Sequence, residues 1–306
     1  MVLRYSPLNW ALSGFNMRLN MNRTPRDIET KFRQSLGAIG PLMCLAEIAS
    51  KELANMDASD LNNLVKEYEH KKLKISHIEL SDVSLYVNLA HIAYINSRAD
   101  HFCDEVIEFN KKETEKKNKK DKEITGKATK GKNKNKQSYN IDSIDFLRKA
   151  VFLVHARNKK LKYSTTKLDE SVYIEYLGQE EIWIIDYYRK LRNIEFHGGV
   201  SENEPPLTLD GDQKKKIYKK YKFSPNEFMN LTVRDVILYS QAWQAVAVLL
   251  CSKIVEIDQE LLSRLTSKYK NSSEERRNNA LRQKLAQDYL QPDHVVSTLA
   301  HQGWVA

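Results

Sequence analysis

The stretch SDVSLYVNLAHIAYINSRADHFCDEVIEFN, residues 81–110, carries the clearest structural pattern in the chain. Its large apolar residues recur every three or four positions and fall near one stripe of a helix: Leu85, Leu89, Ile92, Ile95, Phe102, Val106 and Phe109. A stripe of this length predicts a long helix that packs against other helices. The 306 residues include only 10 Gly and 7 Pro. They show no convincing alternation of apolar and polar residues, so the sequence predicts an all-α protein.

The segments that follow predict three more long helices, at residues 140–160, 171–197 and 224–265. The second of these contains Gly178, where a break is expected because Gly weakens a helix interior. The third includes the most apolar part of the chain. Residues 81–265 therefore have the helical content of a four-helix bundle.

Shorter patterns flank this bundle on both sides. Residues 1–80 predict an N-terminal helical region, whose first helix is indicated by Thr24 as N-cap, Pro25 at the first helical position and the acid Asp27. Residues 266–306 predict a charged C-terminal helix and a tail. The sequence leaves open where either region packs.

The basic character of the chain belongs to two short segments. The net charge is +9, but residues 111–136 hold 12 Lys and 4 acidic residues, and residues 214–222 hold 6 Lys and no acid. Everything outside these two runs sums to −5. The first run has almost no large apolar residue to repay its ordering entropy, so it predicts a mobile Lys-rich loop over residues 111–138.

The remaining composition indicates a cytoplasmic protein without metal or cofactor. Cys44, Cys103 and Cys251 form no spaced Cys/His set, so no structural zinc is expected, and their apolar surroundings predict buried thiols in a reducing compartment. The N-terminus lacks a continuous apolar signal segment. The most apolar run, residues 242–251, is about half the length of a membrane span, so no contact with a membrane is expected.

Two pairs of an Arg and a His with similar spacing stand out as possible sites. They are Arg192 with His197, and Arg148 with His155. About one such pair is expected by chance in a chain of this composition, so the spacing alone decides nothing. Arg148 and His155 lie on one face of an apolar helix, and a place at the edge of a packed surface is the simpler interpretation for them.

The segment LRNIEFHGG, residues 191–199, differs in its context. Asn193 follows Arg192 at once, and Gly198 and Gly199 release the backbone behind the histidine. This segment resembles the signature of the HEPN superfamily, in which an Arg and a polar residue, often Asn, are followed by a few residues and a His. In that family the motif lies toward the end of the third helix of a four-helix bundle.

The resemblance covers about residues 81–265. It implies a HEPN-like four-helix bundle with an N-terminal helical extension and a C-terminal helix. Members of the family are mostly metal-independent endoribonucleases. The resemblance thus implies that His197 is the general acid and base, that Arg192 stabilises the transition state, and that Asn193 orients the phosphate or the imidazole. It also implies a toxin or anti-phage defence effector, with an antitoxin or regulatory protein as a possible partner.

A geometric problem accompanies this assignment. Five residues along a helix correspond to about 500°, which leaves Arg192 and His197 well off a shared face. Either the helix unwinds near Glu195–His197, or a second chain completes the site. The family resemblance implies a homodimer with a composite active site.

A second group of residues is predicted to bind RNA. Arg189 lies one turn before Arg192 and could hold a phosphate, although a surface ion pair explains it equally well. The other members lie in the second lysine run, which combines cations with aromatic residues that can grip phosphates and stack on bases: Lys214, Lys215, Lys216, Tyr218, Lys219 and Lys220. Their alternative is a solvated helix face.

Two other function classes stay open from the sequence. One is a non-catalytic HEPN-like module that binds a nucleotide, RNA or a protein partner. The other is a helical interaction protein whose lysine segments meet acidic partners.

Overall fold

A computed structural model describes residues 23–37, 40–57, 80–125, 145–161, 168–197 and 208–295, together with 59–61, 63 and 66. Helix accounts for 83% of the structure, and no strand occurs in these ranges, which confirms the all-α prediction. The α-helices are α1 (Pro25–Gly37), α2 (Gly40–Ala54), α4 (Leu80–Thr125), α5 (Phe146–Asn158), α6 (Glu170–Leu177), α7 (Gln179–His197), α8 (Gly211–Tyr221), α9 (Val233–Lys253), α10 (Gln259–Thr266) and α11 (Glu274–Tyr289).

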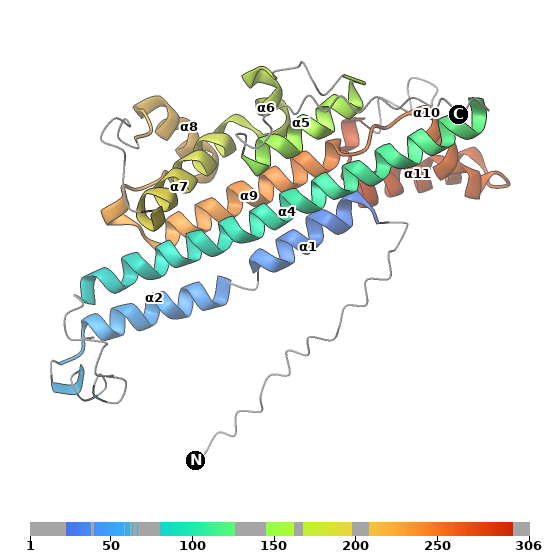
Figure 1. The fold of residues 1–306 in the computed structure, drawn as a ribbon. Coiled ribbons are helices and arrows are strands. Elements are labelled where there is room, and N and C mark those ends of the chain that lie inside the picture. Colours follow the sequence, from blue (N-terminus) through green and yellow to red (C-terminus); the bar gives the residue numbers. More distant parts are fainter. Residues whose placement is uncertain are drawn as a thin grey trace, which may run out of the picture.

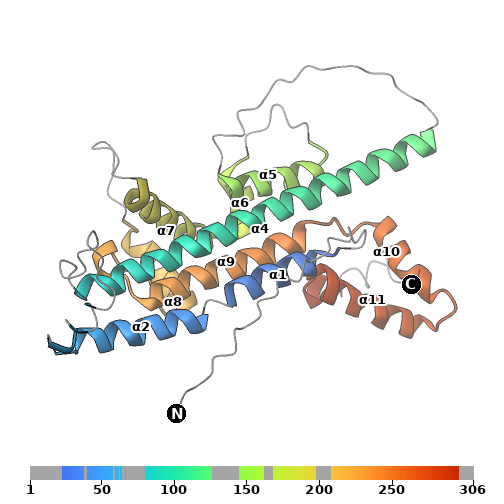
Figure 2. The same ribbon diagram turned by 60° about the horizontal axis from the view of Figure 1, so that its bottom comes forward.

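Helices α4 and α9 run side by side through the molecule as its central pair (Figure 1). Helices α1 and α2 lie along one side of this pair, and α5, α6 and α7 lie along the other. Figure 2 shows α10 and α11 gathered at one end, where α11 contacts α1. The long predicted helices therefore do pack on one another, and α1 and α2 join them. A HEPN-like arrangement in the finer sense stays a prediction.

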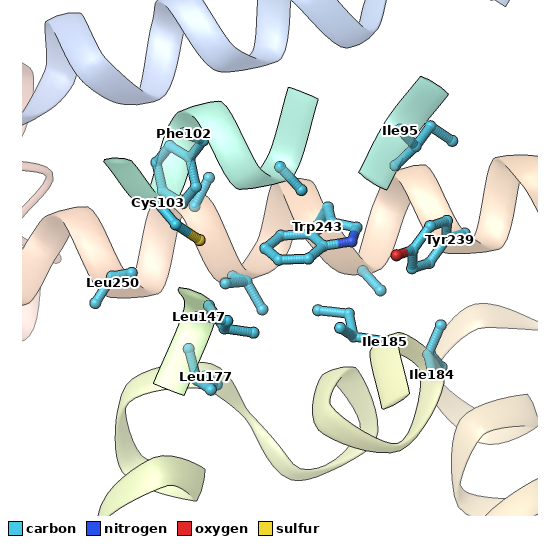
Figure 3. Close-up of a cluster of buried hydrophobic side chains, with 14 of the residues drawn as sticks. Ile95, Phe102, Cys103, Leu147, Leu177, Ile184, Ile185, Tyr239, Trp243 and Leu250 are labelled. Carbon is cyan, nitrogen blue, oxygen red and sulfur yellow. The ribbon is translucent and has the colours of Figure 1, made fainter. Parts of the chain in front are cut away.

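The core surrounds Trp243 of α9, whose side chain is completely buried (Figure 3). The side chains labelled in Figure 3 come from α4, α5, α6, α7 and α9. The labelled side chains are Ile95, Phe102 and Cys103 from α4, Leu147 from α5, Leu177 from α6, Ile184 and Ile185 from α7, and Tyr239 and Leu250 from α9. Burial of this much apolar surface is the main stabilising contribution to the fold.

Helix α1 belongs to the same core. Its Ile28, Phe32 and Leu36 are buried at a spacing of four residues, so they form one stripe. The Phe32 ring stacks on Phe102 with centroids 4.6 Å apart and meets Trp243 edge-on at 6.3 Å. The predicted cap is confirmed, because Asp27 accepts a hydrogen bond from the Thr24 backbone N–H at 2.7 Å. Helix α1 thus packs on the long helices, a point that the sequence left open.

The break between α6 and α7 falls at Gly178, as predicted. Its φ of +85° is a conformation that side chains with a Cβ rarely adopt. A Cβ at this position would also lie 2.2 Å from the carboxylate of Glu181. The 171–197 segment is therefore two helices rather than one, and α7 takes its own direction toward α9.

Asp235 anchors the start of α9 to α7. Its carboxylate is completely buried and accepts a hydrogen bond from the Tyr188 hydroxyl at 2.7 Å. It also accepts from the backbone N–H and side-chain amide of Asn226, both at 2.9 Å. The backbone N–H and hydroxyl of Thr232 complete the set at 2.9 and 3.0 Å. Five donors compensate the desolvation of this carboxylate, which would otherwise be costly.

The predicted loop over residues 111–138 is wrong in its first part. Helix α4 continues without interruption to Thr125. Lys and Glu have high intrinsic helix propensity, and residues 111–125 contain no Gly or Pro. Low apolar content therefore predicted the lack of a core contact and not the lack of a helix. Residues 126–138 lie outside the described part of the chain.

Helix α9 has the length and composition of a membrane span. It has 21 residues and a mean hydropathy of 1.2 in its most apolar 18-residue window. The expectation of no membrane contact rested on the shorter apolar run at residues 242–251, which is only part of this helix. Within the fold, 61% of that window is buried, as in the core helix of a soluble protein. The cytoplasmic location stays a prediction.

Replacing Phe32 by Ala should lower the free energy of unfolding by about 3–5 kcal/mol, because the cavity left between α1, α4 and α9 cannot collapse fully. Urea unfolding followed by far-UV circular dichroism measures this change. Leu45→Ala is the matched control, since Leu45 on α2 is 62% exposed and its loss should cost less than about 0.5 kcal/mol. Equal effects of the two substitutions would show that α1 lies outside the cooperative core.

Candidate functional site

The motif lies in the last two turns of α7. Arg192 is half-buried and Asn193 is exposed. One guanidinium nitrogen of Arg192 donates a hydrogen bond to the Asn193 side-chain oxygen at 2.8 Å. The side chain of His197, and the glycines at 198 and 199, lie outside the described residues. The structure therefore brings Arg192 and Asn193 together and gives only the backbone position of the histidine.

The backbone of α7 stays helical through His197. This helix does not show the unwound turn that was one of the two predicted solutions to the spacing problem. Arg192 and His197 are consequently about 140° apart around the helix axis and about 7.5 Å apart along it. Within one chain, the backbone positions of the two residues therefore lie on different sides of the α7 axis.

Arg189 lies on the inner side of α7 and is held by two carboxylates. Its guanidinium nitrogens lie 3.2 Å from an oxygen of Asp145 and 3.6 Å from an oxygen of Asp100. Its side chain is only 20% exposed. Of the two alternatives that the sequence left open for Arg189, the structure shows the ion pair, and it links α7 to α4 and to the start of α5.

Arg148 extends this network on α5. It makes a bidentate contact with Asp186 of α7, with distances of 3.1 and 2.6 Å, and a further contact with Asp145 at 2.7 Å. Planar, two-point pairing of this kind is the strongest geometry for Arg and carboxylate. His155 lies two turns away, edge-on to Tyr176 at 5.7 Å. The pair Arg148 and His155 therefore serves packing and ion pairing, as the simpler interpretation had it.

The pKa values of two carboxyl groups in this network are shifted in opposite directions. Burial alone would raise the pKa of Asp145, but the backbone N–H of Arg148 and the charges of Arg189 and Arg148 outweigh burial and lower it. Burial raises the pKa of Asp100, and the charges of Arg189 and Arg192 offset this only in part. Arg192 therefore acts electrostatically on the same cluster that holds Arg189.

The lysine run folds as α8, so the helix that its alternative interpretation implied is present. Asp210 caps it by accepting from the backbone N–H groups of Asp212 and Gln213 at 2.9 and 2.8 Å, and the Gln213 side chain accepts in return from Asp210. Ile217 is completely buried. The sequence signal was present, since an Asp followed three residues later by Gln is a capping box.

The predicted RNA-binding residues of α8 fall into two groups. Lys220 and Lys216 face α7, where Lys220 pairs with Glu181 at 2.7 Å and the Lys216 ammonium lies 5.6 Å from the centre of the Trp183 ring. The members on the outward side are Lys215, Tyr218 and Lys219, with Lys214 at the margin. Lys216 and Lys220 are thus engaged with α7 although both stay exposed, whereas Lys215, Tyr218 and Lys219 lie on the other side of the helix.

The carboxylates Asp100, Asp145 and Asp186 were missed as parts of the site. They come from three helices, and only the tertiary structure brings them to one place. Asp145 carried a local signal, because its position just before an apolar helix fits an N-cap, and it accepts from the Arg148 backbone N–H at 2.9 Å. Asp100 stood in a polar face of α4 that gave no indication of its partners.

The cysteines and possible metal ligands give no further site. Cys103 and Cys251 are buried thiols as predicted, but Cys44 is exposed, because the face of α2 that carries it points away from α4 and α9. Across the described ranges, no group of three or more His, Cys, Asp or Glu residues has an arrangement that could hold a metal ion.

Comparison with protein-family models, curated proteins and solved structures finds no match to this chain. The likeness to the HEPN superfamily thus rests on the motif and on the order of the helices.

Asp145→Asn should lower the free energy of unfolding by about 1–3 kcal/mol at pH 7, because Asn keeps the capping oxygen but leaves two guanidinium groups without their shared charge. The pKa of Asp145 is lower in the folded protein than in the unfolded chain, where it is about 4. The ionised carboxylate therefore stabilises the fold above the unfolded pKa, and this stabilisation is lost as the pH falls through the folded pKa. The difference between wild type and variant should therefore stay constant from pH 7 to about pH 5 and shrink as the pH is lowered further in urea unfolding.

Asp169→Asn is the matched control. Asp169 occupies the N-cap position of α6 but makes no side-chain capping bond, and it is exposed. Its replacement should change the stability by less than about 0.5 kcal/mol at every pH. A constant difference for Asp145→Asn across the pH range would contradict the ionic origin of its contribution.

Proposed function

We propose that the protein is a metal-independent endoribonuclease that cleaves RNA by transesterification through the 2′-hydroxyl. The observation that supports this most is the arrangement at the end of α7. Arg192 is half-buried and hydrogen-bonded to Asn193, and its charge acts on Asp100. Both residues lie on α7, which stays helical to His197. A guanidinium, an amide and a histidine are thereby carried by one rigid element.

These residue types suit the chemistry of RNA cleavage. The substrate carries its own nucleophile, so the protein has to move protons and stabilise charge. In this proposal the 2′-oxygen attacks phosphorus while the 5′-oxygen leaves, and the products are a 2′,3′-cyclic phosphate and a 5′-hydroxyl. His197 takes or gives the proton, since imidazole titrates near neutral pH. Arg192 stabilises the charge of the phosphorane, and Asn193 orients the phosphate or the imidazole.

The proposed active site is composite. Because α7 remains helical, Arg192 and His197 of one chain face different directions. A two-fold homodimer that brings two α7 ends together would place the Arg192 of one protomer beside the His197 of the other. Two-fold dimers are the commonest closed assemblies.

The biological role in this proposal is a toxin or anti-phage defence effector in the cytoplasm. An RNase that cuts cellular RNA requires control, and an antitoxin or another regulatory protein would supply it. Within the chain, the positive charge of Arg189, one turn before the motif, is already paired with the carboxylates of Asp100 and Asp145.

The same ion pairs favour a second candidate, a non-catalytic HEPN-like module that binds a nucleotide, RNA or a protein. Arg148 and Arg189 are engaged with Asp186, Asp145 and Asp100, so the cations next to the motif stabilise the fold. In this alternative the end of α7 is a binding surface only.

An RNA-cleavage assay with the purified protein in EDTA distinguishes the endoribonuclease from the non-catalytic binding module. The wild type should release fragments that end in a 2′,3′-cyclic phosphate, and a 2′-O-methyl RNA should stay intact because its nucleophile is blocked. His197→Ala should reduce the rate by about 10²–10⁴-fold, the range for loss of a general acid or base. His101→Ala, on exposed α4 surface, should leave the rate within about twofold. Undiminished cleavage by His197→Ala would refute the assignment.

A mixing experiment tests the composite site. Arg192→Ala and His197→Ala should each be inactive alone, but in an equal mixture about half of the dimers are mixed and each holds one complete site, so about a quarter of the wild-type activity should return. Absence of activity in a mixture that light scattering shows to have exchanged subunits would mean that each site lies within one chain.

A further inference from the structure

Tyr218 is a large aromatic side chain in the middle of a basic helix face. It is 58% exposed, one of the most exposed large hydrophobic side chains in the described part of the molecule. Three lysines of α8 and its C-cap, Lys214, Lys215 and Lys222, lie at positions −4, −3 and +4 from Tyr218, where side chains on a helix are neighbours, and Lys219 follows Tyr218 directly and is exposed. We call these four lysines and Tyr218 the α8 face.

The opposite side of α8 is bound firmly to α7. Ile217 is completely buried, and Glu181 accepts hydrogen bonds from both Lys220 and the Tyr221 hydroxyl. Glu181 is itself buried. Both ends of α8 are capped. Asp210 is the N-cap, and Lys222 is the C-cap in a left-handed conformation with a φ of 58°. The α8 face is consequently presented on a rigid support.

The α8 face combines few apolar groups with much positive charge. Among the described residues of α8, its acid is Asp212, which is 85% exposed and lies 3.6 Å from the Lys215 ammonium, near the limit for an ion pair. An exposed pair of this kind contributes little and is screened by salt. The charge of the α8 face therefore favours binding of a polyanion, and Tyr218 is the aromatic residue that the face offers to such a partner.

An aromatic ring among lysines fits unpaired nucleotides better than other polyanions. A planar ring stacks on a free base while the surrounding ammonium groups contact phosphates. In a duplex the bases are stacked on one another and offer their faces to no side chain. A membrane surface would require a broad apolar side on the helix, and in α8 the apolar residues Ile217 and Tyr221 face α7 instead.

We infer that the α8 face binds single-stranded RNA, with one unpaired base stacked on Tyr218 and the flanking phosphates held by Lys214, Lys215, Lys219 and Lys222. RNA as the polymer rests on the proposed function, whereas the preference for unpaired bases rests on Tyr218. Lys216 lies against Trp183 and Lys220 against Glu181, so α8 runs antiparallel to α7. Trp183 precedes Arg192 by nine residues, about 14 Å along α7. A strand held on α8 is therefore close enough to lead to the motif.

The test measures binding of the wild-type protein to fluorescein-labelled 2′-O-methyl oligonucleotides by anisotropy. These probes lack the attacking hydroxyl, so binding is measured whether or not the protein cleaves RNA. One probe is a single strand of mixed sequence, and the other is a blunt duplex of the same length. The single strand should bind at least about fivefold more tightly than the duplex, in keeping with the contribution of one stacked base.

Tyr218→Leu should weaken binding of the single strand by about 5- to 100-fold and leave duplex binding unchanged within about twofold, because Leu keeps the apolar contact but cannot stack. Tyr218→Phe should bind as the wild type does. The matched control is Tyr86→Leu, since Tyr86 on α4 has the same exposure of 58% and no surrounding lysines at helical spacing. All three substitutions are at exposed positions, so folding is retained.

The lysines are tested through the salt dependence of binding. Each phosphate contact contributes about −0.7 to the slope of log K against log salt for a single strand. Replacing Lys215 and Lys219 together by Gln should reduce the size of the slope by about 1.4. The matched control replaces by Gln both Lys51 and Lys149, which lie on other exposed or half-exposed helix surfaces. This double change should leave the slope unaltered.

Three results would overturn the inference. They are equal loss for Tyr218→Leu and Tyr86→Leu, equal affinity for single strand and duplex, or binding to vesicles rich in anionic lipid without binding to the single strand. Failure of the RNA-cleavage assay together with the expected Tyr218 dependence would instead remove the proposed nuclease activity and retain the α8 face.

Discussion

Burial of α9 is the constraint on which the other helices depend. Its apolar residues extend around most of the helix, so contact with one neighbour cannot remove them from water. Helices α1, α4, α6 and α7 each cover part of its surface, and Trp243 lies where α1 and α4 meet it. This requirement brings the N-terminal helices into the core. It also explains why a helix with the composition of a membrane span is mostly buried within the protein.

Three buried or half-buried carboxylates then determine how α7 lies on this core. Asp235 binds Tyr188, Asp145 binds Arg189, and Asp186 binds Arg148. Apolar packing alone tolerates sliding and rotation, but hydrogen-bonded carboxylates in a partly desolvated setting accept only one arrangement of donors. The rotation of α7 is therefore well defined, and with it the directions in which Arg192 and Asn193 project.

This rigidity connects the fold with the proposed activity. Because α7 persists to His197, the backbone positions of Arg192 and His197 lie about 140° apart around its axis, and this is why the proposed nuclease site is composite. The α8 face lies on the same helix pair and is fixed to α7 through Glu181. Capture of an unpaired strand on α8 and cleavage at the end of α7 would thus depend on one rigid unit, with the lysines supplying affinity and the motif supplying chemistry.

Much of the fold could be read from local patterns. The spacing of apolar residues over 81–110 predicted α4, the Thr24 cap predicted the start of α1, and Gly178 predicted the break before α7, because each depends on residues close together in the chain. The motif of Arg192, Asn193 and His197 was likewise a local feature. The sequence by itself determined an all-α chain and one candidate motif.

Only the tertiary structure decided which charges are available. Arg189 and Lys220 looked like their neighbours in the sequence, yet they are held by Asp145 and Glu181, whereas Lys215 and Tyr218 face outward. Partners more than 30 residues away in the chain leave no periodic signal, since their pairing depends on how whole helices pack and not on local conformation.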